Sequence, residues 1–313
     1  MKLQQAIDQY VSHKRSLGMQ CQTMARLLRA FCKALGDVEV DQARAEAVSA
    51  FIYGRGPVTS TLHHKLQTLR SFYRYLLRRG YVARSPLPTQ VPKEPERLIP
   101  YIYSREELQR LLSAANKERP ACKLEPATMR ALLLLLYGAG LRISEALRLT
   151  LVDCDLEQSL LTIRETKFYK SRLVPLGPDL SQALQLYLVA RSERGHPAPA
   201  EAFLLVTRHS LPVSVQLAED SFKRICRKVG VRRTDGSRFK PRLHDLRHAF
   251  AVHRLIACYR EGGDVQRLLL QLSTYLGHVD LDSTQRYLTL TPELLGQASH
   301  RFEQYAAPRG GGL

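Results

Sequence analysis

The chain lacks any long apolar segment. None of its apolar runs approaches the roughly 18 residues of a membrane-spanning helix, and its first residues contain no signal-peptide core. The six cysteines are scattered without a C-x-x-C pair, which argues against a zinc site and indicates reduced thiols. Internal repeats and low-complexity tracts are also missing. We therefore expect a cytoplasmic protein with no membrane association and no bound metal.

Acidic residues are scarce relative to basic ones. The 313 residues include 47 Lys and Arg against 29 Asp and Glu, which gives a net charge of +18. The excess is spread along the whole chain and favours a polyanionic partner, most simply nucleic acid. Hydrophobic residues make up 44% of the chain, as in an ordinary globular protein. The length allows two domains and a sizeable core.

Four amphipathic stripes predict a helical bundle in the first 82 residues. They lie at about residues 3–11, 24–35, 47–52 and 62–77. The polar face of the fourth stripe is almost entirely basic and is interleaved with aromatic residues. A solvated polar face would explain such charges, but their single sign favours contact with phosphates. The candidate contacts are His64, Lys65, Arg70, Arg74 and Arg78.

Five prolines stand within residues 84–100. Such a segment can form neither a helix nor a central strand, so it predicts an extended linker and a domain boundary. We expect a helical domain at 1–83, this Pro-rich linker at 84–100, a second domain at 101–305 and a flexible tail at 306–313.

The second domain is predicted to be mainly α-helical with a small antiparallel β-sheet. A capping box at Ser104–Glu107 precedes one helix, residues 126–137 form a buried helix, and Ser144 is the expected N-cap of a short one. Residues 160–163 and 172–176 alternate as strands do, on either side of a polar turn. Further helices are expected at 178–194, 215–229, from Pro241 onward, 265–276, about 283–288, and from Thr291.

The stretch from Pro241 to Phe250 indicates a phosphate site. His244 and Arg247 are three residues apart, so their side chains leave one face of a helix. An arginine forms bidentate bonds to phosphate oxygens, and a neutral imidazole beside it can accept a proton. A basic helix start that faces solvent explains this stretch equally well. We expect the nearby His248 to satisfy a backbone carbonyl.

Four other stretches carry side chains that suit the same chemistry, namely Arg142, Lys167, His278 and Tyr287. Together with the first stretch they resemble the tyrosine recombinase (phage integrase) family in order and spacing across about 200 residues. The segment from Tyr259 to Asp280 resembles the transposon-borne branch of that family. The matching motifs are Gly-Ala-Gly-Leu-Arg-Ile-Ser-Glu-Ala-Leu at 138–147, Thr-Lys-Phe-Tyr-Lys-Ser-Arg-Leu-Val-Pro-Leu at 166–176, His-Asp-Leu-Arg-His at 244–248, Leu-Gly-His at 276–278 and Thr-Gln-Arg-Tyr at 284–287.

The resemblance implies a site-specific recombinase that cuts and rejoins DNA through a covalent 3′-phosphotyrosyl intermediate, without metal or cofactor. Tyr287 would be the nucleophile that attacks phosphorus. Arg142 and Arg247 would bind the non-bridging oxygens and stabilise the charge of the transition state. Tyrosines near a C-terminus usually pack, and we interpret Tyr259, Tyr275 and Tyr305 in that way. The nine-residue distance from His278 distinguishes Tyr287.

The remaining roles concern protons and support. His244 would accept the proton of the phenol, and Lys167 would protonate the leaving 5′-oxygen, with Lys170 on the same turn as its rival. His278 would donate a hydrogen bond to the phosphate. Glu145, three residues after Arg142, would orient that arginine. Further expected contacts with DNA are Lys170, Arg172 and Arg242. Arg172, like Arg148 and Arg164, is most simply a solvent-facing or DNA-backbone charge.

The resemblance also implies an assembly. The two domains would form a clamp around double-stranded DNA that carries inverted half-sites, and a homotetramer would assemble on it in the nucleoid of a prokaryotic cell. Accessory proteins or sister recombinases are compatible with this arrangement. Two other functions remain open from the sequence: a DNA-relaxing enzyme like the type IB topoisomerases, and a non-catalytic DNA-binding protein of the same fold.

Overall fold

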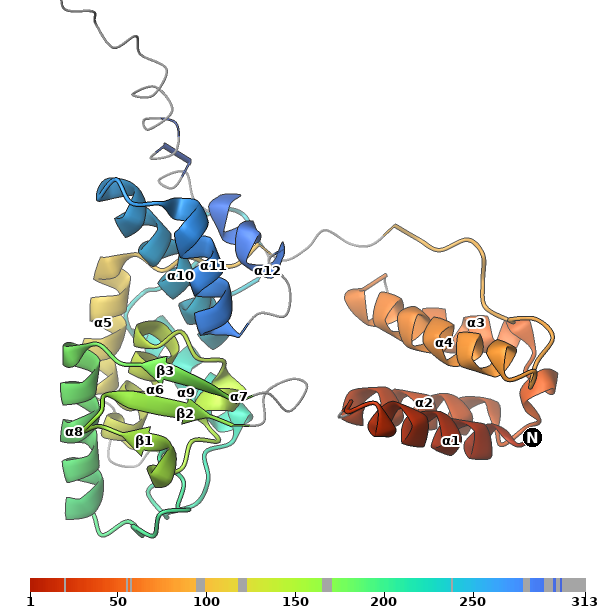
Figure 1. The fold of residues 1–313 in the computed structure, drawn as a ribbon, viewed down its shortest axis with the longest axis horizontal. Helices are drawn as coiled ribbons and strands as arrows, with labels where there is room; N and C mark the ends of the chain where they lie inside the picture. The colour runs from red at the N-terminus through yellow and green to blue at the C-terminus, as the bar shows by residue number, and fades with distance from the viewer. Residues whose placement is uncertain are drawn as a thin grey trace, which may run out of the picture. The chain divides into compact units, whose positions relative to one another are not determined.

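The computed structural model describes residues 1–19, 21–54, 56, 58–93, 99–117, 123–164, 171–237, 239–277, 282–289, 295, 296 and 299. The chain divides into two compact units, one with the described residues up to 93 and the other with those from 99 onward (Figure 1). Helices dominate both units, and the second unit adds a small antiparallel sheet. The predicted fold class is confirmed.

The first unit contains the four predicted helices. Their apolar stripes form one core, in which the rings of Tyr10 and Phe72 meet edge to face at 5.4 Å and those of Phe31 and Tyr73 at 6.4 Å. Such aromatic pairs add stability beyond the area that they bury. The helices are α1 (Leu3–Ser16), α2 (Gln22–Leu35), α3 (Ala45–Tyr53) and α4 (Ser60–Arg78).

The basic face of α4 is exposed, with one exception. The side chains of His64, Arg70, Arg74 and Arg78 are open to solvent. The ammonium of Lys65 instead donates a hydrogen bond to the carbonyl oxygen of Phe51 (2.7 Å) and lies 4.5 Å from the centre of its ring. The contact of Lys65 with DNA stays a prediction. The side chain fastens α4 to the end of α3.

The second unit is built around α6. This helix is apolar on nearly all sides, as a helix surrounded by others requires, and it packs against α5, α8 and α10. Helices α10 and α11 lie side by side (Figure 1). The helices are α5 (Arg105–Ala115), α6 (Pro126–Gly138), α8 (Pro178–Glu193), α9 (Val215–Lys228), α10 (Leu243–Arg260) and α11 (Val265–Leu276), and the Ser104 capping box is present.

The sheet has the order β1-β2-β3, with antiparallel neighbours. Strands β2 (Leu160–Ile163) and β3 (Arg172–Pro175) agree with the prediction, and their inward side chains join the core that surrounds α6. The register pairs Ile163 with Arg172, which places Arg172 at the start of β3. Strand β1 (Cys154–Asp155) was not predicted, because two residues are too short to show an alternating pattern.

Two predicted helix starts and one predicted helix type differ from the structure. Helix α10 begins at Leu243 rather than at Pro241, because the carboxylate of Asp245 accepts the backbone N–H of Arg242 and makes that residue the N-cap. The N-cap of α7 (Ile143–Ala146) is Arg142 rather than Ser144, for the same reason. The helix expected at 283–288 is a short α12 (Asp282–Gln285) followed by a 3₁₀ turn at Arg286–Thr289.

Among the described residues, no helix combines the length and the apolar character needed to cross a membrane. The start of the helix expected at Thr291 lies outside the described residues, as does Tyr305.

Candidate active site

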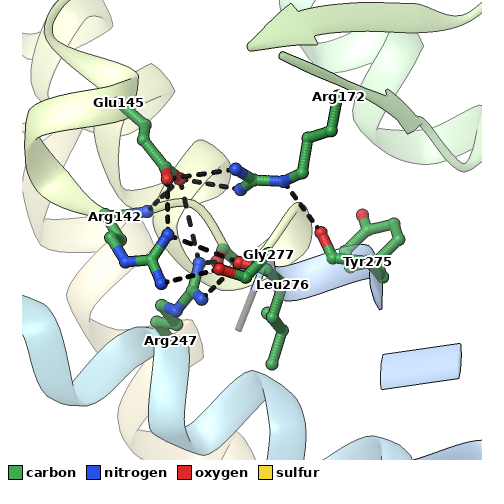
Figure 2. A network of polar contacts seen from close by, with 8 residues as sticks. Arg142, Glu145, Arg172, Arg247, Tyr275, Leu276 and Gly277 are labelled. Atoms are coloured by element: carbon green, nitrogen blue, oxygen red, sulfur yellow. Dashed lines mark hydrogen bonds and ion pairs between the residues drawn. The ribbon is translucent and has the colours of Figure 1, made fainter. Parts of the chain in front are cut away.

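Glu145 lies at the centre of a cluster of arginines (Figure 2). Its Oε1 accepts hydrogen bonds from Nη1 of Arg142 (2.7 Å) and Nη1 of Arg172 (3.1 Å). Its Oε2 accepts the backbone N–H of Arg142 (3.0 Å) and Nη2 of Arg172 (2.8 Å). Nη1 of Arg247 stands 3.8 Å from Oε2, which is within range of an ion pair but too far for a hydrogen bond. One buried carboxylate thus gathers three guanidinium groups.

The same three arginines bind the C-terminal end of α11. Nε of Arg172 donates to the carbonyl of Tyr275 (3.0 Å), Nη2 of Arg247 to that of Leu276 (2.6 Å), and Nη2 of Arg142 to that of Gly277 (3.1 Å) (Figure 2). The last carbonyls of a helix have no partners within it and carry partial negative charge. The helix end therefore stabilises cations that would otherwise repel one another.

Burial and charge set the protonation of this cluster. The side chain of Glu145 is 8% exposed, and burial alone would raise its pKa. The hydrogen bonds and charges of Arg172 and Arg142 outweigh burial and lower the pKa to about 2. Arg247 is 2% exposed, and burial, with the nearby charge of Arg142, lowers the pKa of its guanidinium to about 10. Glu145 and Arg247 are therefore both ionised near neutral pH.

Arg247 is further held by the chain before α7. Its Nη1 donates to the carbonyl of Gly140 (2.6 Å). Gly140 has a φ of +60°, and a Cβ at this position would lie 2.6 Å from Cδ1 of Phe250. Only glycine fits such a left-handed and crowded position without displacing its neighbours. The turn between α6 and α7 thereby brings the backbone close enough to hold Arg247.

A row of three aromatic rings connects His244 with Tyr287. The ring of His244 stands 4.9 Å from that of His248, and the ring of His248 stands 5.5 Å from that of Tyr287. Tyr287 is 3% exposed and packs in the apolar cluster formed by α10 and α11. Its phenol lies near enough to Arg247 to raise the pKa of that guanidinium, against the larger effect of burial. The tyrosine therefore stands beside the arginine cluster.

The surroundings of His244 favour the neutral form of its imidazole. Partial burial of its ring and the positive charges of Arg247 and Arg242 lower its pKa below the ordinary histidine value, while Asp245 opposes them. Its side chain keeps contact with solvent. A neutral imidazole at this position can accept a proton.

The structure thus brings five of the predicted residues into one region: Arg142, Glu145, His244, Arg247 and Tyr287. Three others, Lys167, Lys170 and His278, lie outside the described residues. Arg242 caps α10 and forms an ion pair with Asp245 (2.8 Å) while staying exposed.

The prediction for Arg172 is wrong. A solvent-facing or DNA-facing side chain was expected, but it is 13% exposed and directed at Glu145. Nothing local reveals a carboxylate 27 residues earlier in the chain. The contact of His248 with the rings of His244 and Tyr287 was also missed, although His244 and His248 are four residues apart and so share a helix face.

The sequence profile of the phage integrase family matches residues 102–293. The putative integrase/recombinase y4rB of Sinorhizobium fredii is 37% identical over 307 residues, which cover 96% of each chain. The tyrosine recombinase XerA of Thermococcus kodakarensis is 32% identical over 255 residues, 80% of this chain and 78% of XerA. The solved structure of the Tn1549 transposon integrase with a circular intermediate DNA has a TM-score of 0.70, covers 98% of this chain and 100% of its own, and is 17% identical.

Proposed function

The chain belongs to the phage integrase family of tyrosine recombinases, and we propose that it performs site-specific DNA recombination at the Glu145 cluster, with Tyr287 as the nucleophile. One observation carries this proposal. Two guanidiniums, those of Arg142 and Arg247, are gathered by one carboxylate beside a phenol. Two cations that can bind phosphate oxygens beside a nucleophile suit transesterification at a phosphodiester.

The reaction follows from the charges of these groups. The phenol oxygen of Tyr287 attacks phosphorus, a phosphotyrosine bond forms, and the bond to the 5′-oxygen breaks. Arg142 and Arg247 bind the non-bridging oxygens, on which negative charge accumulates in the transition state. Among the described residues, Arg247 donates two of its five N–H groups to backbone carbonyls, which leaves others for a phosphate. Attack by the free 5′-hydroxyl of a second strand reverses the step and rejoins DNA.

The protons move through two groups. His244, whose pKa is lowered by burial and by neighbouring arginines, accepts the phenol proton. The ring of His248 contacts the rings of both His244 and Tyr287, which places the proton acceptor and the nucleophile in one region. On the family resemblance alone, Lys167 protonates the leaving 5′-oxygen and His278 donates a hydrogen bond to the phosphate.

The first unit supplies binding to the DNA backbone. The exposed basic side chains of His64, Arg70, Arg74 and Arg78 follow α4, and a row of basic side chains is what a phosphate backbone attracts. Arg242 would add a contact from the second unit. We assign residues 1–83 to a DNA-binding domain, 84–100 to the linker, 101–305 to the catalytic domain and 306–313 to a tail.

The assembly is inferred from the family resemblance. Solved structures of similar fold include a lambda integrase dimer bound to a core site and the XerH recombinase bound to a palindromic substrate. The matching substrate for this chain is double-stranded DNA with inverted half-sites, on which four copies assemble in the nucleoid, with accessory or sister recombinases where the element requires them. The similarity to a transposon integrase agrees with a mobile-element origin.

A nicked suicide duplex tests the nucleophile. Its inverted half-sites are taken from the DNA that flanks the gene, and a covalent protein–DNA adduct is detected on a denaturing gel. Wild type and Tyr259→Phe should form the adduct, and Tyr287→Phe should not. An adduct with the Tyr287 variant would assign the nucleophile to another residue. No adduct with wild type, or relaxation of plasmids that lack such a site, would contradict the recombinase mechanism on this substrate.

A further inference from the structure

Arg172 is bound on three of its nitrogen atoms. Nη1 and Nη2 hold both oxygens of Glu145 in a two-pronged arrangement, at 3.1 and 2.8 Å, and Nε donates to the carbonyl of Tyr275 (Figure 2). This bidentate geometry is specific to arginine, since a lysine could reach only one oxygen well. With its side chain 13% exposed, Arg172 has the bonding of a fixed support rather than of a DNA contact.

We propose that Arg172 is a positioning residue of the recombination reaction, which acts by occupying Glu145 so that Arg142 and Arg247 keep their charge for the DNA phosphate. This inference rests on the proposed roles of Arg142 and Arg247. It assigns to Arg172 a part in catalysis without contact with the substrate.

The hydrogen bonds of Glu145 support this inference. A carboxylate offers about four lone-pair positions. Here Oε1 accepts one hydrogen bond from Arg142 and one from Arg172, and Oε2 likewise accepts one from each of these two residues. Arg247 is left at 3.8 Å, outside hydrogen-bonding distance. Without Arg172, two positions would open, and Arg247, whose Nη1 already lies within ion-pair range of Oε2, could move in to fill them.

The charge balance points in the same direction. Three guanidiniums against one carboxylate leave these four side chains with a net charge of +2, and removal of Arg172 leaves +1. A buried pair is screened little by solvent, so the lost charge is felt by a phosphate bound nearby. The remaining carboxylate would then neutralise half of the charge of Arg142 and Arg247.

Arg172 also connects β3 to the end of α11. A Cβ on Gly277 would lie 3.0 Å from Nη1 of Arg172, so the arginine packs directly against that glycine. The carbonyls of Leu276 and Gly277, next along the chain from the one that Arg172 holds, are bound by Arg247 and Arg142. Arg172 therefore fixes the carboxylate and the helix end that together orient the two proposed phosphate ligands.

The experiment compares Arg172→Gln with the double variant Arg172→Gln/Glu145→Gln. Single-turnover cleavage of the suicide duplex and DNA affinity are measured separately on the full chain. Arg172→Gln should slow cleavage about 10- to 100-fold, by analogy with residues that orient metal ligands, while its DNA affinity stays unchanged. Adding Glu145→Gln removes the uncompensated carboxylate, so the double variant should cleave faster than Arg172→Gln alone. A merely structural arginine gives no such rescue.

Arg194→Gln is the matched control, because Arg194 also pairs with a mostly buried glutamate, Glu125 (2.8 Å), outside the site. It should lower the melting temperature without slowing cleavage by folded protein. If Arg172→Gln does not fold, Arg172→Lys should still cleave more slowly than wild type, because it cannot hold both oxygens. A double variant no faster than Arg172→Gln, or a wild-type rate in Arg172→Lys, would overturn the proposal. Absence of an adduct with wild type would instead contradict the proposed function.

Discussion

Glu145→Gln should remove a pH-dependent part of the free energy of unfolding. The ordinary pKa of a glutamate is 4.5, and the arginines lower that of Glu145 to about 2 in the folded protein. A carboxylate with a lowered pKa in the folded state stabilises the protein above its unfolded pKa. That stability is lost as the pH falls from about 4.5 through about 2, because the folded state must then take up a proton against the charges of Arg142 and Arg172.

The magnitude follows from the shift. A difference of about 2.5 pKa units at about 1.4 kcal/mol each corresponds to about 3 kcal/mol at pH 7, of which about 2 kcal/mol is lost by pH 3. The side chain is 8% exposed, so solvent screens this contribution little.

Urea unfolding followed by far-UV circular dichroism from pH 7 to pH 3 measures this contribution. The free energies of unfolding of wild type and Glu145→Gln should converge as the pH falls, since the glutamine has no proton to gain. Asp235 is the control, because its pKa is also lowered to about 2, by Arg233, but on the surface. In 1 M NaCl the contribution of Asp235 should shrink while that of Glu145 persists. Parallel curves for wild type and Glu145→Gln would refute the reasoning.

Two further predictions concern backbone fit and the proton acceptor. Gly140→Ala should lower the free energy of unfolding by about 1–2 kcal/mol through left-handed backbone strain and by roughly 1–3 kcal/mol more through steric overlap with Phe250. Gly230 also has a positive φ (+69°) but has open space around it, so Gly230→Ala should show the backbone strain alone. The melting temperatures of the two variants should therefore differ by about 2–4 °C for each kcal/mol of steric overlap, and equal melting temperatures would contradict the crowding at Gly140. At subsaturating DNA, the cleavage rate should fall with decreasing pH around a midpoint below 6.5, because burial and neighbouring guanidinium charges lower the pKa of His244. Arg242→Gln removes one of those charges and should raise the midpoint, and an unchanged midpoint would assign the titration to another group.

Local patterns in the sequence were sufficient for most helices. Apolar residues at helical spacing gave α1 to α6 and α8, and Ser104 with Glu107 marked the start of α5. Two helix starts were missed because an arginine is an uncommon N-cap and the usual rules favour serine. In both cases the backbone N–H of the arginine donates to the carboxylate of an acidic residue three positions later. The two-residue strand β1 carries no pattern of its own and exists only through its pairing with β2.

The sequence by itself determined the family, the mainly helical fold and the residue types of the candidate site, because these depend on short motifs and periodic patterns. Only the tertiary structure decided what those residues do to one another. A charged residue at a strand end looks the same in sequence whether it faces water or a carboxylate, and the fold directs Arg172 at Glu145, 27 residues away in the chain. It likewise buries Arg247 among backbone carbonyls of Gly140 and Leu276. These contacts join segments far apart in the chain, and they form only when α7, β3, α10 and α11 pack together.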